Sequence, residues 1–496
     1  MSVLDEVMAL AIPGYQASVR TILQRLQMAI GDAAFQGITC EQFTRATIAL
    51  IDRPKVEPSL RLLLLSGLSS LGWWCDIPYG DAEIAAMSQT SRRALFAVVK
   101  DVKFGAPKAS PTARFNHAVF VGRLVGLMHS PTRGSFDYVR ALVADRANTR
   151  IDVFHGGPLT PEMRAYKDAM LGADASRVRY VCMDTQADWM TQAAVHGPYT
   201  YHYWCEDAFA VHIGLLAALG PTVMFTCADL APVQYADVYW YGQEADYMAG
   251  LWERQGAPQG YARNYRTLES TPLNLPGAGR TRTRGELGLP ADELIIVSAG
   301  NRLGTDLDQP FLDGLAARLR ANPQTCWLTV GGLDAPWIAA LSSTLGRQFR
   351  HIPFDDDLPS LFAQCDIFAN PFRAGGGHSS VIAIEAGCIV LTREDKGDVG
   401  ALVPIPHRAD GEGAYLQSLQ TLIDNPDQRQ TWKQEQQAYL IHCGDQANFA
   451  RELAQVNDLA VRRFAGRIAL PLEALFDQPI SKLKQLKRAG RPGRLR

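Results

Sequence analysis

Short apolar segments alternate with helical segments twice along this 496-residue chain, and this double alternation constrains the fold more than any other feature. The first series starts near residue 112 with HAVFVG and continues through RIDVFH, RVRYVC, PTVMF and ADVYWYG. The second starts with ELIIVSAG and continues through CWLTVGG, FRHIPF, CDIFANPF and CIVLT. Apolar strands separated by helices predict βαβ units and parallel sheets with helices on both faces.

A segment rich in proline, glycine and arginine, TPLNLPGAGRTRTR at 271–284, separates the two series and is interpreted as an interdomain linker. The expected fold class is therefore α/β, with two Rossmann-like domains that face each other across a cleft. An all-helical region precedes them, because residues 1–107 show helical spacing of apolar residues and no strand pattern. The expected domains are 1–107 (helical), 108–275 (first Rossmann-like), 276–442 (second Rossmann-like) and 443–496 (C-terminal helix and basic tail).

Composition restricts the partners and the compartment. The net charge of −2 provides no overall field that would attract nucleic acid. Nine cysteines without a C-x-x-C pair are typical of a reduced, cytosolic protein. The acidic N-terminus does not resemble a signal peptide, and the most apolar stretch, 62–74, is too short to span a bilayer. We expect a soluble, cytoplasmic chain whose basic tail is solvated or touches an acidic partner or membrane surface.

A glycine-rich turn after the fourth strand of the second series carries the strongest chemical signal. Glycines let a ligand approach the backbone closely, and the serines after them are expected to cap a helix whose amide groups and positive end suit a diphosphate. The histidine between them could donate a hydrogen bond to a phosphate oxygen. The alternative is an ordinary glycine-rich loop with a capping serine. The residues concerned are Gly375, Gly376, Gly377, His378, Ser379 and Ser380.

The stretch NPFRAGGGHSS resembles the donor-diphosphate motif of GT-B glycosyltransferases, particularly the O-GlcNAc transferases and the high-molecular-weight adhesin N-glycosyltransferases. The segment RGELGLPADELIIVSAGNRL is similar to the start of the second domain in those families. The resemblance implies a hexosyl- or N-acetylhexosaminyl-transferase that moves a sugar from a nucleotide-diphosphate sugar, a UDP-sugar, to a protein or glycan acceptor. It also implies inversion at the sugar and no metal or other cofactor.

The resemblance further implies roles for residues around the turn. His351, Ile352 and Pro353 would lie along the base and ribose of the donor. Where those families place a lysine after the first strand of this domain, the present chain has Asn301 and Arg302, and Arg302 is the nearest cation. The ribose-binding carboxylate of the families falls on Ile382 here, and the nearest acid is Glu385, one helical turn further on.

Candidates on the acceptor side come from the first series. His129 follows its first strand and is the leading candidate for the base that deprotonates the acceptor. His155 ends a strand and is either an acceptor contact or a turn residue. Asp207 follows the aromatic segment YTYHYWC at an expected helix start, and His202 lies within that segment; the two are either weak acceptor-side candidates or parts of a capped helix start beside packed aromatic residues. The acidic run 355–357 is interpreted as a helix cap rather than a metal site.

Other enzyme classes lack their motifs in this sequence. No G-x-x-x-x-G-K-[ST] is present, and no G-x-G-x-x-G follows the opening strand of either series, which argues against P-loop enzymes and dehydrogenases. A G-x-S-x-G elbow is absent too, which argues against an α/β-hydrolase. Two alternatives remain: a nucleotide-sugar 2-epimerase, which uses the same two-sheet frame, and a non-catalytic GT-B-like interaction module.

Overall fold

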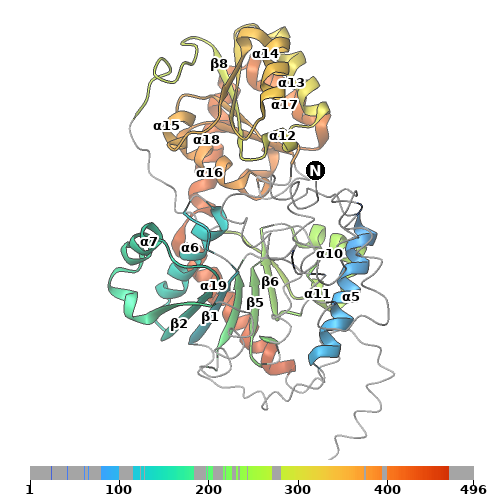
Figure 1. Ribbon diagram of the computed structural model, residues 1–496, viewed down its shortest axis with the longest axis vertical. Coiled ribbons are helices and arrows are strands. Elements are labelled where there is room, and N and C mark those ends of the chain that lie inside the picture. The colour runs from blue at the N-terminus through green and yellow to red at the C-terminus, as the bar shows by residue number, and fades with distance from the viewer. Residues whose placement is uncertain are drawn as a thin grey trace, which may run out of the picture. The chain divides into compact units, whose positions relative to one another are not determined.

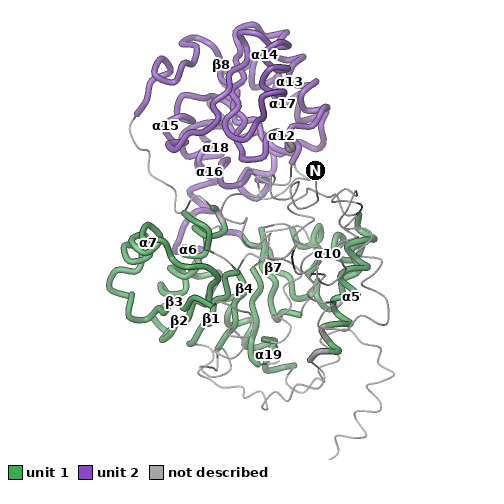
Figure 2. The backbone as a smooth tube through the Cα atoms, viewed as in Figure 1, with its two compact units in different colours: residues 1–268, 450–496 green, residues 269–449 purple. Residues whose placement is uncertain are grey.

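The computed structural model describes residues 80–99, 115–122, 124–127, 129–183, 197, 199–204, 216–217, 219–225, 231–232, 235–242, 244–270, 281–373, 376–393 and 399–467, with isolated positions 24, 42, 61 and 65. The chain divides into two compact units, unit 1 with residues 1–268 and 450–496, and unit 2 with residues 269–449 (Figure 2). Most of the predicted helical region 1–107, residues 271–280 of the predicted linker and residues 468–496 lie outside the described residues.

Unit 1 contains a seven-stranded parallel sheet in the order β3-β2-β1-β4-β5-β6-β7 (Figure 1). Its strands are β1 (Asn116–Val121), β2 (Arg150–His155), β3 (Val178–Cys182), β4 (Thr200–Trp204), β5 (Thr222–Phe225), β6 (Val238–Tyr241) and β7 (Tyr265–Thr267). The helices described with it are α5 (Asp81–Val99), α6 (Ser130–Ala144), α7 (Pro161–Leu171), η4 (Gly172–Arg177), α10 (Ala245–Arg254) and α11 (Gln259–Ala262).

The central strand β4 was not predicted, because its sequence TYHYW lacks the aliphatic residues of a typical buried strand. All five of its residues are nevertheless buried. The polar groups of His202 in this strand find partners in distant parts of unit 1, because Tyr138 on α6 and His117 on β1 both form hydrogen bonds with its ring.

Unit 2 contains a six-stranded parallel sheet in the order β10-β9-β8-β11-β12-β13. Its strands are β8 (Leu294–Gly300), β9 (Thr325–Gly331), β10 (Phe349–Ile352), β11 (Ile367–Ala369), β12 (Ile389–Arg393) and β13 (Arg408–Ala409). Its helices are α12 (Leu303–Asp306), α13 (Gln309–Ala321), α14 (Ala335–Leu345), η5 (Gly346–Gln348), α15 (Leu358–Phe362), α16 (Gly377–Ala386), η6 (Gly400–Leu402), η7 (Ile405–His407), α17 (Gly411–Asp424) and α18 (Pro426–Cys443).

The sheet of unit 2 is buried on both faces, as a parallel sheet requires. One apolar cluster joins it to α12, α13, α14 and α17, and a second joins its other face to α15, α16 and α18 (Figure 1). Strands such as β8 and β9 are therefore apolar almost throughout, and this is why the second series was recognisable in the sequence. The expectation of two Rossmann-like sheets is confirmed.

The last described helix, α19 (Gln446–Arg467), returns the chain from unit 2 to unit 1. Its end is held within unit 1 by Arg467, whose Nε and Nη2 lie 2.6 and 2.8 Å from the carboxylate of Asp237. Arg463 donates to the backbone carbonyl of Asp237 at 2.8 Å. The predicted helices over 411–465 are thus confirmed. Among the described helices, none combines the length and the apolar character that a membrane crossing demands.

Candidate functional site

The strand order of unit 2 reverses between β8 and β11, which are hydrogen-bonded neighbours. In open α/β sheets, ligands bind beyond the carboxyl ends of the strands at such a reversal. The segment after β8 begins with Asn301 and Arg302, and the segment after β11 leads through Asn370 and Arg373 to the glycine turn. The predicted phosphate turn therefore lies where the topology favours a ligand.

Arg373 is buried and connects the segments that follow β8 and β11, which together form the corner at the reversal in strand order. Its Nη1 lies 2.7 Å from Asp306 on α12, its Nη2 donates to the carbonyl of Ala299 at 2.7 Å, and its Nε donates to Asn370 Oδ1 at 3.1 Å. Gly300 has no room for a Cβ, because that atom would collide with Arg373 Nη1. From the sequence, Arg302 was the only cation expected here. The arginine inside NPFRAGGG was the available signal, but its partners were not visible in the sequence.

A glycine with a left-handed backbone begins the helix after β11. Gly376 has φ of 105° and is the N-cap of α16. A Cβ at this position would lie 2.7 Å from Arg373 Nη2 and 2.7 Å from Asn370 Oδ1. The turn therefore requires glycine both for its dihedral angle and for the close approach of these two side chains.

The helix begins earlier than expected, so the prediction that Ser379 or Ser380 caps it is wrong. Gly376 supplies the cap position, and Ser380 lies inside the first turn, where its backbone N–H donates to the Gly376 carbonyl at 2.9 Å. His378 is the second residue of α16 and is half-buried. Gly375 lies outside the described residues.

Two buried polar atoms at the glycine turn have no hydrogen-bond partner within the described part of the chain. They are Nδ2 of Asn370, a residue 1% exposed, and Oγ of Ser380, a residue 0% exposed. Buried polar groups are normally hydrogen-bonded, so each such atom calls for an explanation. Asn370 directly follows β11 and Ser380 lies in the first turn of α16, so an anion bound at the start of this helix would provide acceptors.

His351 ends β10 with one ring nitrogen fixed and the other unpartnered. Its Nδ1 lies 3.0 Å from Thr329 Oγ1, which also lies 3.3 Å from the carbonyl of Arg350. Because the threonine gives its proton to that carbonyl, we assign Nδ1–H of His351 as the donor to Oγ1 and Nε2 as the unprotonated nitrogen. Burial lowers the pKa of His351, which favours this neutral form. Within the described residues, Nε2 has no partner.

The residues after His351 present an apolar surface. Ile352 is half-buried and Pro353 is exposed. Phe354, which was not predicted as a site residue, is 71% exposed. A phenyl ring in solvent at the carboxyl end of a strand offers a flat surface for an aromatic ligand.

The remaining predicted residues of unit 2 are placed as follows. Asn301 and Arg302 are exposed, and Arg302 Nη2 lies 3.6 Å from Asp306 Oδ1. Glu385 is exposed in the last turn of α16, roughly 12 Å along the helix axis from Gly377. A ribose contact by Glu385 stays a prediction, with the acid at the opposite end of α16 from the glycine turn.

The acidic run before α15 serves the fold. Asp357 is the N-cap of that helix and accepts a hydrogen bond from Ser360 N at 3.2 Å. Asp355 receives both terminal nitrogens of Arg282 at 2.9 Å each. The interpretation of this run as a helix cap is confirmed at Asp357.

In unit 1, His129 lies in the segment after β1, at the reversal between β1 and β4. It is the N-cap of α6, and its Nδ1 lies 3.4 Å from Thr132 N and 2.9 Å from Thr132 Oγ1. Burial lowers the pKa of His129 to about 4, so the ring is neutral at physiological pH. A capping role accounts for its position, and the role of catalytic base stays a prediction.

The other acceptor-side candidates differ in accessibility. His202 is 1% exposed, with Nε2 at 2.8 Å from His117 Nδ1 and Nδ1 at 2.8 Å from the Tyr138 hydroxyl. Both of its nitrogens are engaged inside the core, which fits the packed alternative, and an acceptor contact by His202 stays a prediction. His155 is also buried, and its Nδ1 donates to the Gly157 carbonyl at 3.0 Å, as a turn residue would. Asp207 lies outside the described residues.

Comparison with known proteins identifies the fold. No family model matches the chain, and no curated protein matches its sequence. Among solved structures, it is similar to a mutant O-GlcNAc transferase from Thermobaculum terrenum, with a TM-score of 0.56 and 14% identity over 94% of this chain and 98% of that one. It is also similar to a glycosyltransferase from Rickettsia africae, with a TM-score of 0.50 and 11% identity over 70% of this chain and 99% of that one. The chain therefore has the GT-B fold.

Proposed function

We propose that this chain is a glycosyltransferase that moves a hexosyl or N-acetylhexosaminyl group from a nucleotide-diphosphate sugar to a protein or glycan acceptor. A UDP-sugar is the proposed donor, and the reaction is proposed to invert the sugar and to need no metal. The donor would bind to unit 2, at the segments after β8, β10 and β11.

The observation that carries the proposal is the pair of unpartnered buried atoms, Asn370 Nδ2 and Ser380 Oγ, at the glycine turn. Both can donate to a phosphate oxygen. They flank the start of α16, where a helix of ten residues directs its positive end and its first amide groups. A diphosphate in this corner would satisfy both atoms and would be stabilised by the exposed Arg302.

The chemistry follows from stabilising the leaving group. The bond between the anomeric carbon and the diphosphate oxygen breaks while an acceptor oxygen or nitrogen bonds to that carbon. The negative charge that develops on the diphosphate is met by donors already oriented in the folded state, which is the main source of rate enhancement in such a site. His129 is the proposed base, taking the acceptor proton as that proton becomes acidic in the transition state.

The base of the nucleotide is proposed to lie along His351, Ile352 and Pro353, against the exposed ring of Phe354. The unprotonated Nε2 assigned to His351 would accept an N–H, and the phenyl ring would stack on the base. Phe354→Ala should therefore weaken binding of any nucleotide, whereas His351→Ala should change the ranking of UDP, GDP and dTDP.

Calorimetric titration with UDP, GDP and dTDP tests the donor site. His378→Ala and Ser380→Ala should each lower the affinity for the nucleotide that binds best by roughly 5- to 150-fold. This range corresponds to about 1 to 3 kcal/mol for a hydrogen bond to a charged group. His442→Ala is the matched control, because His442 is an exposed histidine on α18 of the same unit. Unchanged affinity in both site variants would remove the glycine turn from the donor site.

Turnover distinguishes the reaction. Incubation with a panel of nucleotide sugars, with and without cell extract as acceptor, should give slow hydrolysis alone and sugar transfer when an acceptor is present. Formation of an isomeric nucleotide sugar without acceptor would identify an epimerase instead. If the chain neither binds nor converts any nucleotide sugar in the panel, it is a non-catalytic module and the proposal is overturned.

A further inference from the structure

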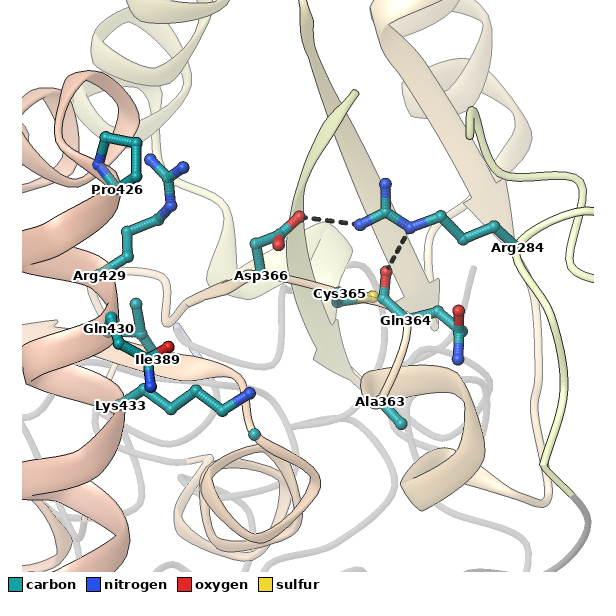
Figure 3. Close-up of a pocket in the computed structure, with 11 residues that line it drawn as sticks. Arg284, Ala363, Gln364, Cys365, Asp366, Ile389, Pro426, Arg429, Gln430 and Lys433 are labelled. Carbon is teal, nitrogen blue, oxygen red and sulfur yellow. Dashed lines mark hydrogen bonds and ion pairs between the residues drawn. The ribbon is translucent and has the colours of Figure 1, made fainter. Parts of the chain in front are cut away.

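A cavity lies within unit 2 at the amino ends of β11 and β12, whereas the glycine turn follows the carboxyl end of β11. It has a volume of about 290 Å³ and is bordered by the residues just before β11 and β12, by the end of α16 and by α18 (Figure 3). Since α16 begins at the glycine turn and ends at this cavity, the two places are separated by the length of the helix, roughly 15 Å. The cavity is therefore distinct from the proposed donor site.

Positive charge predominates in the lining of this cavity. Arg284, Arg429 and Lys433 contribute to it, and Asp366 is the carboxylate among its lining residues. Figure 3 shows Arg429 and Lys433 extending from α18, with Arg284 and Asp366 across the cavity. The negative charge of Asp366 is already balanced by Arg284, because one of its oxygens accepts from Arg284 Nη2 at 3.1 Å and from Ile295 N at 2.8 Å.

Neither of the two cations on α18 pairs with a carboxylate among the residues that the structure describes. Arg429 donates through Nη1 to the carbonyls of Leu422 and Ile423, which are neutral acceptors at the end of α17. Lys433 forms no ion pair or side-chain hydrogen bond within the described part of unit 2. Two cationic groups thus share one concave space without a carboxylate of their own.

The end of α16 is shaped to leave room for the lysine. Gly387 is its C-cap with φ of 94°, and a Cβ there would lie 2.7 Å from Lys433 Nζ. The ammonium group therefore sits directly against a glycine backbone at the border of the cavity. A helix C-terminus attracts cations, so this position favours the ammonium group of Lys433 and leaves its donors available for a ligand.

We propose that this cavity binds a small anion of the phosphate class through Lys433 and Arg429. A phosphate group offers several strong acceptor oxygens, which match an ammonium group and a guanidinium fork. The bound species is either free phosphate or the phosphate of a nucleotide. The site does not depend on the proposed sugar transfer, and its ligand would occupy unit 2 together with a donor.

Calorimetric titration of the full chain with inorganic phosphate, and separately with UDP, tests the site. Lys433→Gln should weaken phosphate binding roughly 10-fold, the size expected for losing one charge-assisted hydrogen bond. Arg320→Gln is the matched control, because Arg320 is an exposed cation on α13 of the same unit. His378→Ala, at the other end of α16, should leave phosphate binding unchanged while lowering the affinity for UDP.

A second pair of variants keeps the test independent of any folding defect in Lys433→Gln. Gln430 borders the cavity and is exposed, so Gln430→Glu should weaken phosphate binding and Gln430→Lys should strengthen it. UDP binding that responds to Lys433→Gln as phosphate does would identify a nucleotide as the occupant. The proposal is overturned if neither phosphate nor UDP binds to the wild-type chain in a way that depends on Lys433 and Gln430, or if His378→Ala abolishes phosphate binding.

Discussion

The guanidinium of Arg373 lies 2.7 Å from the carboxylate of Asp306, and their side chains are only 7% and 8% exposed. The two residues are 67 positions apart in the chain. Their ion pair links the turn after β11 to the short helix after β8, the two segments that border the reversal in the strand order of unit 2. The corner proposed for the diphosphate is therefore held in shape by a buried pair rather than by the exposed Arg302.

Removing the guanidinium should destabilise unit 2 substantially. Arg373→Met leaves the Asp306 carboxylate buried and without its partner, and loss of one member of a buried ion pair typically costs about 3 to 5 kcal/mol. Arg302→Met should cost about 1 kcal/mol or less, because its ion pair with Asp306 is partly exposed. Urea unfolding of both variants measures the difference. Equal, small losses would show that Arg373 does not organise the corner.

Gly376→Ala should disturb the same corner without changing any charge. Alanine at φ of 105° is strained, at a cost of about 1 to 3 kcal/mol, and its Cβ would crowd Arg373 and Asn370. Gly413→Ala is the control, because this glycine in α17 has open space around it, and alanine favours a helix. Urea unfolding and UDP titration should show losses for Gly376→Ala only. Wild-type behaviour of this variant would contradict the geometry of the turn.

The glycine turn could be located from the sequence because its signal is local. Three glycines followed by a short polar run after an apolar strand appear within a dozen residues. The partners of Arg373 could not be predicted, because Asp306 and Ala299 approach it only through the pairing of β8 with β11. The helix start was misplaced at the serines, because a capping serine and a left-handed glycine look equally plausible in GGGHSS until the backbone angle is known.

The fold itself was predictable where burial alone determines the residue type. Strands such as β9 are recognisable because every position but the last is buried and most are apolar. The centre of unit 1 was not, because β4 carries tyrosines and a histidine in place of aliphatic residues, and the partners of that histidine come from distant elements. The buried position of His202 could not be chosen over the acceptor-side alternative for the same reason: its two partners, His117 and Tyr138, come from β1 and α6.

The buried histidine pair should make the stability of unit 1 depend on pH. Burial lowers the pKa of His117 from 6.5 to about 4 and lowers the pKa of His202 well below its usual value. The folded protein therefore binds fewer protons than the unfolded chain, so the free energy of unfolding decreases as the pH falls below 6.5 and continues to decrease toward about 4. For His117 alone, the loss between pH 8 and pH 5 is about 2 kcal/mol.

Urea unfolding at pH 8 and pH 5, followed by tryptophan fluorescence, measures this loss. His117→Asn keeps an amide near the position of Nδ1 but cannot take up a proton, so its stability should decrease less between the two pH values than that of the wild type. An identical decrease in both proteins would mean that His117 is not protonated on unfolding in this range.

His129 has two proposed roles that substitution can separate. As N-cap of α6 its side chain accepts from Thr132 N, and His129→Ala should cost about 1 kcal/mol of stability by losing that cap. Serine is itself a favoured capping residue, so His129→Ser should retain most of the stability. If the ring is the base, both variants should lower turnover roughly 100-fold or more while leaving donor affinity intact. Turnover that follows stability, reduced in the alanine variant and normal in the serine variant, would assign His129 to the cap alone.

The pH dependence of the rate gives an independent measurement of the role of His129. With a pKa of about 4 the ring is already unprotonated at neutral pH, so the rate should decline only as the pH approaches that value. A decline centred near pH 6.5 would point to a different, solvent-exposed group as the base.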